Sequence, residues 1–285
     1  MTVDCHVHIW QRPEQLGLEV DESGQVAHAL AADVSDMPEM SGDMERSIVL
    51  GFRAANLGLG VPNEFISEFV ASQPDRLIGF AGIDPAEPDA MDNLDEAVGN
   101  LDLKGVVIAP ACQAIHPMDS RCLELYEDAA ERGMPVVFHT PVLPSRKAVM
   151  SFQRPELVDE VAREFPGLRI LITSMGYPFI TETVSLLEKS ENVFADTAGL
   201  AHRPWLLYQA LVLAEEAGAT GKILFGSHFP FETPQAAIEA IYSVNALTHG
   251  TELPTVSRES LTAIIQHDAV AALVIPDVDS DGGGE

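Results

Sequence analysis

The sequence predicts an α/β fold built as a single (β/α)8 barrel of the TIM type. Eight short apolar runs recur along the chain, and from the second run onward their starts lie 23 to 35 residues apart. That interval is the length of one strand–helix unit. The runs are continuous rather than alternating, which is typical of parallel strands covered on both faces. Eight evenly spaced units with no linker between them favour a barrel over a doubly wound open sheet.

The predicted strands and helices follow one another in a regular order. Apolar residues recur at helical spacing in the segments that follow the strands. Residues 234–244 begin with a proline, which is well tolerated at the first position of a helix. We expect strands at residues 3–8, 48–50, 77–83, 106–109, 135–138, 170–172, 193–195 and 223–225. We expect helices at residues 63–72, 120–132, 180–187, 234–244 and 258–273.

One domain, residues 1–276, contains all of these elements, including an extra C-terminal helix at 258–273. A long loop, residues 11–43, follows the first strand and is the one large excursion from the repeat. Residues 277–285 form an acidic, glycine-rich tail that is expected to be disordered.

The composition excludes several classes of protein. Acidic residues number 44 against 16 basic ones, giving a formal net charge of −28. Binding to nucleic acid or to an anionic membrane through bulk charge requires a positive surface, so neither is expected as a partner. Only four lysines occur while acids run along the whole chain, and molar salt would screen their repulsion within about 3 Å. We therefore expect a halophilic protein of a salt-loaded cytoplasm, with an ordinary acidic protein as the alternative.

Cysteine usage and hydropathy agree with a cytoplasmic location. Three cysteines cannot form a disulfide framework, and their spacing matches no zinc knuckle. The N-terminus has no basic segment before a long apolar one, and no apolar run approaches the ~18 residues of a membrane span. A soluble cytoplasmic protein is expected.

Polar residues end several predicted strands, at the end of the barrel that forms the active site in this fold. His6 and His8 stand at i and i+2 in the first strand, which places both imidazoles on one face. His139 closes the fifth strand, Ser174 follows the sixth and His228 follows the eighth. Neutral imidazole is a common ligand of Zn²⁺ and related ions. The sequence therefore predicts a site at the barrel mouth, with or without a metal ion.

Two further residues are weaker candidates for that site. Asp196 ends the seventh strand, where its carboxylate would either hydrogen-bond the rim or contribute to catalysis by binding substrate. Arg53 follows the second strand and is the nearest candidate cation for a substrate carboxylate, with a solvated loop residue as the alternative.

Short motifs along nearly the whole chain resemble one known family. They are residues 4–8 (DCHVH), 103–106 (LKGV), 134–140 (MPVVFHT), 174–178 (SMGYP), 194–197 (FADT) and 225–230 (FGSHFP). In this order they resemble the amidohydrolase superfamily, specifically the amidohydrolase-2 branch that includes aminocarboxymuconate-semialdehyde and resorcylate decarboxylases and related hydrolases. The resemblance implies a divalent metal held by His6, His8 and His139, with zinc expected first and manganese, iron or cobalt as alternatives. It also allows a homodimer.

The chain departs from this family at two positions. The family usually has His where Ser174 stands and Asp, a metal ligand and proton-transfer group, where His228 stands. Neutral His228 can ligate or act as a base near its ordinary pKa of about 6.5, but it supplies no negative charge. Ser174 has no acid–base function near neutrality unless another group activates it. If all four imidazoles bind one ion, the tetrahedron is closed, and closed sites tend to be structural.

The preferred interpretation is a metal-dependent hydrolase or decarboxylase acting on a small carboxylic acid or its ester or amide. In this interpretation His228 is a fourth ligand or the proton-transfer group, and a divalent ion polarises a carbonyl or lowers the pKa of water. A metal-free enzyme that resembles pyrone-dicarboxylate lactonase is one alternative. A barrel that has lost catalysis and persists as a binding or structural protein is the other, favoured by the two departures.

Overall fold

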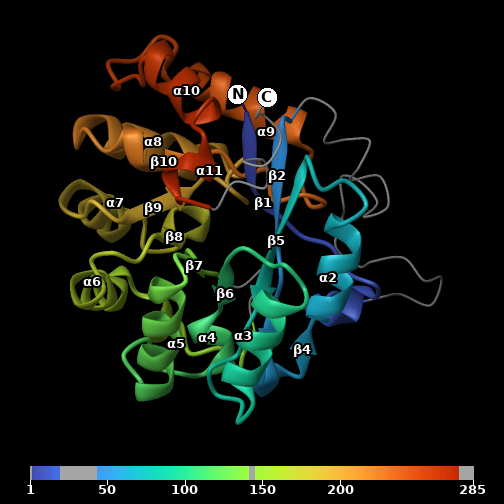
Figure 1. The fold of residues 1–285 in the computed structure, drawn as a ribbon. Coiled ribbons are helices and arrows are strands. Elements are labelled where there is room, and N and C mark those ends of the chain that lie inside the picture. Colours follow the sequence, from blue (N-terminus) through green and yellow to red (C-terminus); the bar gives the residue numbers. More distant parts are fainter. Residues whose placement is uncertain (1, 20–43, 141–144, 276–285) are drawn as a thin grey trace, which may run out of the picture.

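The computed structural model describes residues 2–19, 44–140 and 145–275, and it confirms the predicted barrel. Eight parallel strands form one sheet (Figure 1). In sheet order they are β1 (Val3–Val7), β2 (Arg46–Leu50), β5 (Leu77–Gly82), β6 (Val106–Ile108), β7 (Val136–Phe138), β8 (Ile170–Ile172), β9 (Val193–Asp196) and β10 (Ile223–Leu224). Each of the eight predicted apolar runs overlaps one of these strands, although β2 begins two residues earlier and β9 ends one residue later than predicted.

Backbone contacts join the first and last strands. The amide of Cys5 donates to the carbonyl of Phe225 at 2.9 Å, and the amide of His8 donates to the carbonyl of Phe229 at 2.8 Å. A parallel bridge between Val7 and Phe229 extends this seam. The sheet therefore curls round until β1 lies beside the segment that follows β10.

Helices surround the sheet (Figure 1). They are α2 (Asn63–Val70), α3 (Ala90–Gly99), α4 (Pro110–Gln113), α5 (Ser120–Glu131), α6 (Pro155–Glu164), α7 (Ile180–Lys189), α8 (Pro204–Glu216), α9 (Pro234–Tyr242), α10 (Arg258–Ile265) and α11 (Ala269–Ala272). The predicted stretch 258–273 is thus two helices, and the Asp268 side chain caps the second by accepting from the amides of Val270 and Ala271.

A short hairpin and several 3-10 turns lie in the segments that connect the main strands and helices. A two-stranded antiparallel hairpin pairs β3 (Arg53–Ala54) with β4 (Leu59–Gly60). The 3-10 turns are η1 (Pro13–Leu16), η4 (Ala55–Leu57), η5 (Met150–Gln153), η6 (Thr173–Gly176), η7 (Thr220–Lys222) and η8 (Val244–Thr248). Residues 20–43 of the predicted loop and the tail 277–285 lie outside the described residues.

Alternation along the strands divides the core into two layers. Side chains two residues apart on a strand share a face, so Ile48 and Leu50 of β2 pack in the same cluster while Val49 packs in the other. The inner cluster draws Phe80, Val107, Val137, Leu171, Phe194 and Leu224 from successive strands, together with α11. The outer cluster lies between the sheet and the helices. Both faces of each strand are buried, which explains the continuous apolar runs.

One glycine makes room inside the barrel. A Cβ on Gly105 would lie 2.5 Å from the Phe80 ring, closer than real Cβ contacts allow. Phe80 is fully buried and is among the largest side chains of the inner cluster. The glycine before β6 therefore lets the aromatic ring fill the barrel.

No helix among the described residues combines the length and apolar character needed to cross a membrane.

Candidate active site

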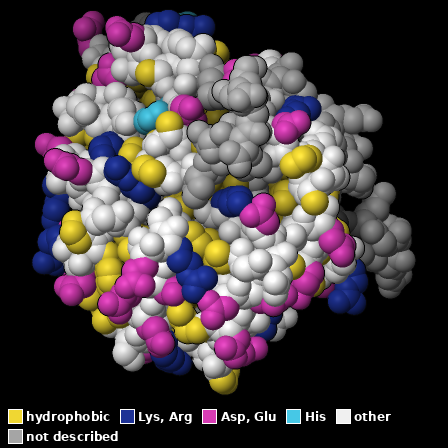
Figure 2. Space-filling view, viewed as in Figure 1, with side chains coloured by type: hydrophobic (Ala, Val, Ile, Leu, Met, Phe, Trp, Pro, Cys, Tyr) yellow, Lys and Arg dark blue, Asp and Glu magenta, His cyan; other side chains and the backbone are white. Residues whose placement is uncertain are grey.

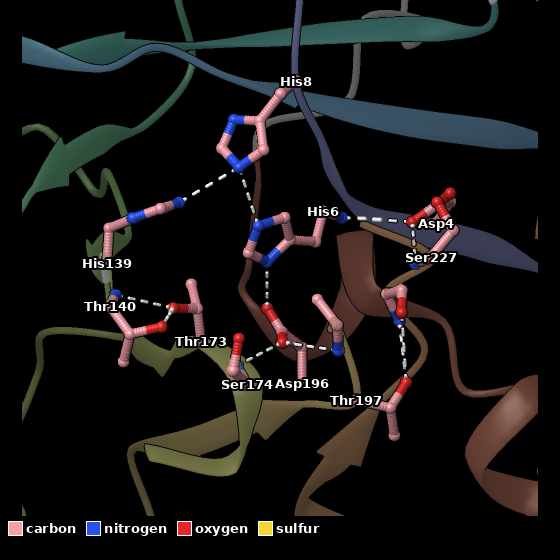
Figure 3. Close-up of polar contacts among 12 residues, drawn as sticks. Asp4, His6, His8, His139, Thr140, Thr173, Ser174, Asp196, Thr197 and Ser227 are labelled. Carbon is pink, nitrogen blue, oxygen red and sulfur yellow. Dashed lines mark hydrogen bonds and ion pairs between the residues drawn. The ribbon is translucent and has the colours of Figure 1, made fainter. Parts of the chain in front are cut away.

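Four imidazoles converge at the carboxyl ends of β1, β7 and β10. His6 Nε2 lies 3.0 Å from His8 Nε2, and His139 Nε2 lies 3.2 Å from the same His8 atom (Figure 3). The ring of His228 lies 5.2 Å from that of His6 and 5.7 Å from that of His8, centroid to centroid. All four side chains are buried or nearly so. Strand ends that are far apart in the sequence thus bring these ring nitrogens together.

The donor set has the chemistry of a divalent metal site. His6, His8 and His228 each offer a nitrogen within 4.8 Å of the others, and His139 joins this set through His8. A tetrahedral ion with metal–nitrogen bonds of about 2.0–2.1 Å separates its ligand nitrogens by about 3.3 Å. The observed 3.0 and 3.2 Å are close to that spacing. Nδ1 of His228 is also buried without a partner among the described residues. These residues therefore fit a metal.

Asp196, at the end of β9, fixes the orientation of His6. Its Oδ2 accepts from His6 Nδ1 at 2.8 Å, while Oδ1 accepts from the amides of Ser174 at 2.6 Å and Ala198 at 3.0 Å (Figure 3). With the proton held on Nδ1, the Nε2 lone pair of His6 faces His8. A carboxylate that holds a ligating histidine in this way sets its tautomer and raises its basicity.

A second buried carboxylate ties β1 to the segment after β10. Asp4 Oδ1 accepts from the amide of Ser227 at 2.9 Å and from the amide of His6 at 3.2 Å. Burial raises the pKa of Asp4 to about 6, although the hydrogen bonds from Ser227 oppose this shift. Gly226 is required beside it, because a Cβ there would lie 2.9 Å from the Cβ of His6. These residues hold the first and last strands in register at the site.

Ser174 and His228 sit on strained turns. Ser174, Met175 and His228 have φ values of 55°, 50° and 68°, in the left-handed region that non-glycine residues rarely adopt. Such strain costs about 1–3 kcal/mol per residue and clusters at functional sites. A Cβ on Gly199, which follows β9, would lie 3.4 Å from His228 Nδ1 and 3.7 Å from Ser174 Oγ. Ser174 Oγ and His228 Nδ1 therefore both lie next to Gly199.

Aromatic rings wall the imidazole group. Phe231 stacks on His228 with ring centroids 4.7 Å apart, and Phe52 lies 5.5 Å from His139. Trp10 packs 6.1 Å from Phe231 and continues this wall. The rings place apolar surface beside the imidazoles.

Three of the imidazoles favour the neutral form in the folded chain. Burial, reinforced by neighbouring imidazoles, lowers the pKa of His8, His139 and His228 well below 6.5. A neutral ring keeps a lone pair for a metal ion or for a proton. The site can therefore bind a cation and accept protons at pH 7.

The metal-free protein is expected to lose stability as the pH falls below about 6.5. Below this pH the histidines of the unfolded chain bind protons, whereas the buried imidazoles of the folded chain stay neutral. The free energy of unfolding therefore decreases as the pH falls. Asp4 acts in the opposite direction, because its folded-state pKa lies near 6 rather than 3.8. Each group contributes about 1.4 kcal/mol per pH unit within its window, so three imidazoles outweigh one carboxyl. Urea denaturation at pH 7.5, 6.5 and 5.5 measures the trend, and a flat profile would contradict it.

Arg53, the predicted substrate-binding cation, is held by an acidic partner. Its Nη2 donates to Glu87 Oε1 at 2.8 Å, and its Nε donates to Glu87 Oε2 in a short contact. The guanidinium thus forms a bidentate pair across 34 residues of sequence, which nothing in the local sequence indicates. Binding of substrate by Arg53 stays a prediction.

The family comparison assigns the barrel and its histidine-lined mouth to a known class of enzyme. A family model described as Amidohydrolase matches residues 3–267 of the chain. The chain belongs to this amidohydrolase family, so it is an enzyme of the hydrolase or carboxy-lyase kind. No curated protein matches the chain.

Several solved structures share the fold at low sequence identity. A dihydroxybenzoic acid decarboxylase from Polaromonas, with bound manganese and the inhibitor 2-nitroresorcinol, is 17% identical with a TM-score of 0.63, covering 96% of both chains. A probable 2-pyrone-4,6-dicarboxylic acid hydrolase from Acinetobacter baumannii, with citric acid bound, is 14% identical (TM-score 0.67; 96% of this chain, 99% of the other). An amidohydrolase from Burkholderia multivorans with bound zinc is also 14% identical (TM-score 0.66; 97% and 100%).

Proposed function

We propose that this protein is a metal-dependent enzyme that hydrolyses or decarboxylates a small organic acid or its ester or amide. The observation that carries the proposal is the convergence of the His6, His8 and His139 Nε2 atoms within 3.0–3.2 Å steps beside His228. Similar structures contain manganese or zinc and are named for aromatic or pyrone acids, which supports both the metal and the substrate class.

Each group of residues at the site has its own proposed role. His6, His8 and His139 would hold the ion, with zinc or manganese as the first candidates, and the ion would polarise a substrate carbonyl or carboxylate. Asp196 keeps the His6 lone pair directed at the ion through the 2.8 Å hydrogen bond. Phe52 and Phe231 exclude water and contact the flat face of the acid. Ser174 can hydrogen-bond substrate through Oγ without exchanging a proton.

His228 is the proposed proton-transfer group. Burial lowers its pKa well below 6.5, so the neutral ring, the form that can accept a proton, predominates at pH 7. Hydrolysis needs such an acceptor for a proton of the attacking water. Decarboxylation instead breaks the bond to the carboxylate, and the carbon that keeps the electron pair takes a proton. The neutral ring is compatible with hydrolysis, while the decarboxylases among similar structures support the second reaction.

Metal content and turnover, measured together, test the proposal. Protein purified without chelator should contain about one equivalent of a divalent metal by elemental analysis. It should turn over members of a panel of aromatic acids, lactones and esters, with CO₂ release distinguishing decarboxylation. His139→Ala should abolish this turnover. Turnover without stoichiometric metal would establish the metal-free, lactonase-like alternative. Binding without turnover, with activity only in the Ser174→His/His228→Asp double variant, would establish a barrel that has lost catalysis.

We also propose that the protein works in a salt-loaded cytoplasm. Acidic side chains are spread over the face that Figure 2 shows, interspersed with apolar and basic ones. At a net charge of −28, self-repulsion destabilises the compact state until salt screens it. The melting temperature should therefore rise by several degrees between 0.1 M and 2 M KCl, as differential scanning fluorimetry can record. An unchanged or falling melting temperature would contradict this proposal.

A further inference from the structure

Arg203 is a cation at the barrel mouth with no acidic partner among the described residues. It precedes α8, and its guanidinium lies over the ring of Tyr177, 4.3 Å from the ring centroid. Tyr177 follows η6 and is 38% exposed. Arg53 differs from it, because the Nε and Nη2 groups of Arg53 already donate to the carboxylate of Glu87.

Three contacts show that the loops after β8 and β9 lie against the site. The amide of Ser174 donates to Asp196 at 2.6 Å, joining the loop after β8 to the end of β9. Gly199, four residues before Arg203, faces both His228 Nδ1 and Ser174 Oγ. The amide of Tyr177 donates to the carbonyl of Ser174 at 3.0 Å. The stacked Tyr177–Arg203 pair therefore joins the loops after β8 and β9, which carry Ser174 and Gly199.

We propose that Arg203 binds the carboxylate of the substrate and so selects for organic acids over their neutral analogues. This inference rests on the proposed function, which supplies the small organic acid. Stacking on Tyr177 fixes the plane of the guanidinium, and a planar fork of donors matches a carboxylate in bidentate fashion. The four imidazoles carry no negative charge, and the buried carboxylate beside them, Asp196, is already engaged by His6 Nδ1 and by the amides of Ser174 and Ala198.

Binding measured apart from turnover tests the inference. Isothermal titration of 2,6-dihydroxybenzoate and of its neutral analogue resorcinol is compared for the wild type, Arg203→Gln and the matched control Arg258→Gln, all at the same KCl concentration. Arg258, at the start of α10, also lies over a tyrosine ring, 3.8 Å from the centroid of Tyr242. Arg203→Gln should weaken binding of the acid by about 10- to 100-fold and leave resorcinol binding unchanged. Arg258→Gln should change neither affinity. Arg203→Lys should recover only part of the loss, since lysine lacks the planar fork.

Several outcomes would overturn the inference. Equal weakening of acid and resorcinol by Arg203→Gln would make its effect structural. Wild-type affinity for the acid in Arg203→Gln, or no binding of the acid by the wild type, would remove the carboxylate site. Failure of the proposed function is read separately, from metal content and turnover. Acid binding that depends on Arg203 in a chain without turnover would leave the inference standing while the function falls.

Discussion

Replacing His8 with alanine is expected to abolish stoichiometric metal binding and any turnover that depends on it. His8 Nε2 lies 3.0 Å from His6 Nε2 and 3.2 Å from His139 Nε2. Its removal therefore takes away the nitrogen that both of the other two ligands contact. Changes to groups that only orient a ligand cost about 10- to 100-fold in metal affinity. Losing the central ligand should cost more than that. Elemental analysis after loading with Zn²⁺ or Mn²⁺ and gel filtration measures the loss directly.

The matched control is His249→Ala, which removes an exposed imidazole outside the site. It should keep the metal content of the wild type. His8→Gln keeps most of the side-chain volume and separates metal loss from the cavity that alanine leaves in the core. Circular dichroism checks that each variant folds. A folded His8→Ala protein with one equivalent of metal would show that His6, His139 and His228 suffice without His8.

The strand pattern is what made the barrel predictable. The strand β8 has helices on one face and the barrel interior on the other, so each of its residues is apolar and the run stands out from the surrounding sequence. The same regularity fixes where strands end, and the imidazoles of His6, His8, His139 and His228 could be assigned to one mouth. Helix ends were less predictable. The break between α10 and α11 depends on the Asp268 cap, which interrupts an otherwise continuous apolar pattern.

Partnerships across the barrel could not be predicted in the same way. Asp196 and His6 are separated by 190 residues, and Asp4 and Ser227 by 223. Nothing near Asp196 in the sequence indicates whether its carboxylate hydrogen-bonds another side chain or binds substrate. The structure shows that it accepts a hydrogen bond from His6 Nδ1 at 2.8 Å. The same applies to Arg53, whose pairing with Glu87 depends on two loops meeting. The left-handed turn at Ser174 has no glycine or asparagine at that residue to signal it.

Asp196→Asn is expected to weaken metal binding by about 10- to 100-fold while leaving the fold intact. The asparagine carbonyl can still accept from the amides of Ser174 and Ala198, as Oδ1 does now. Its NH₂ group would then face His6 Nδ1 and require that atom to be an acceptor. The His6 proton would move to Nε2, the atom 3.0 Å from His8 Nε2, where it blocks ligation. Competition with a chromophoric chelator measures the affinity, and ¹⁵N NMR of the imidazole nitrogens reports the tautomer.

Asp84→Asn provides the comparison, because Asp84 is buried and its oxygens accept from the amides of Ala55 and Ala86 with no imidazole among these contacts. It should lower the free energy of unfolding, since one amide then faces an NH₂ group, yet keep the metal affinity of the wild type. Asp196→Ala removes the acceptor without imposing the wrong tautomer. It should therefore weaken metal less than Asp196→Asn, although it leaves two buried amides unpaired. Stronger weakening by alanine would mean that Asp196 acts through its charge or its backbone contacts rather than through the His6 proton.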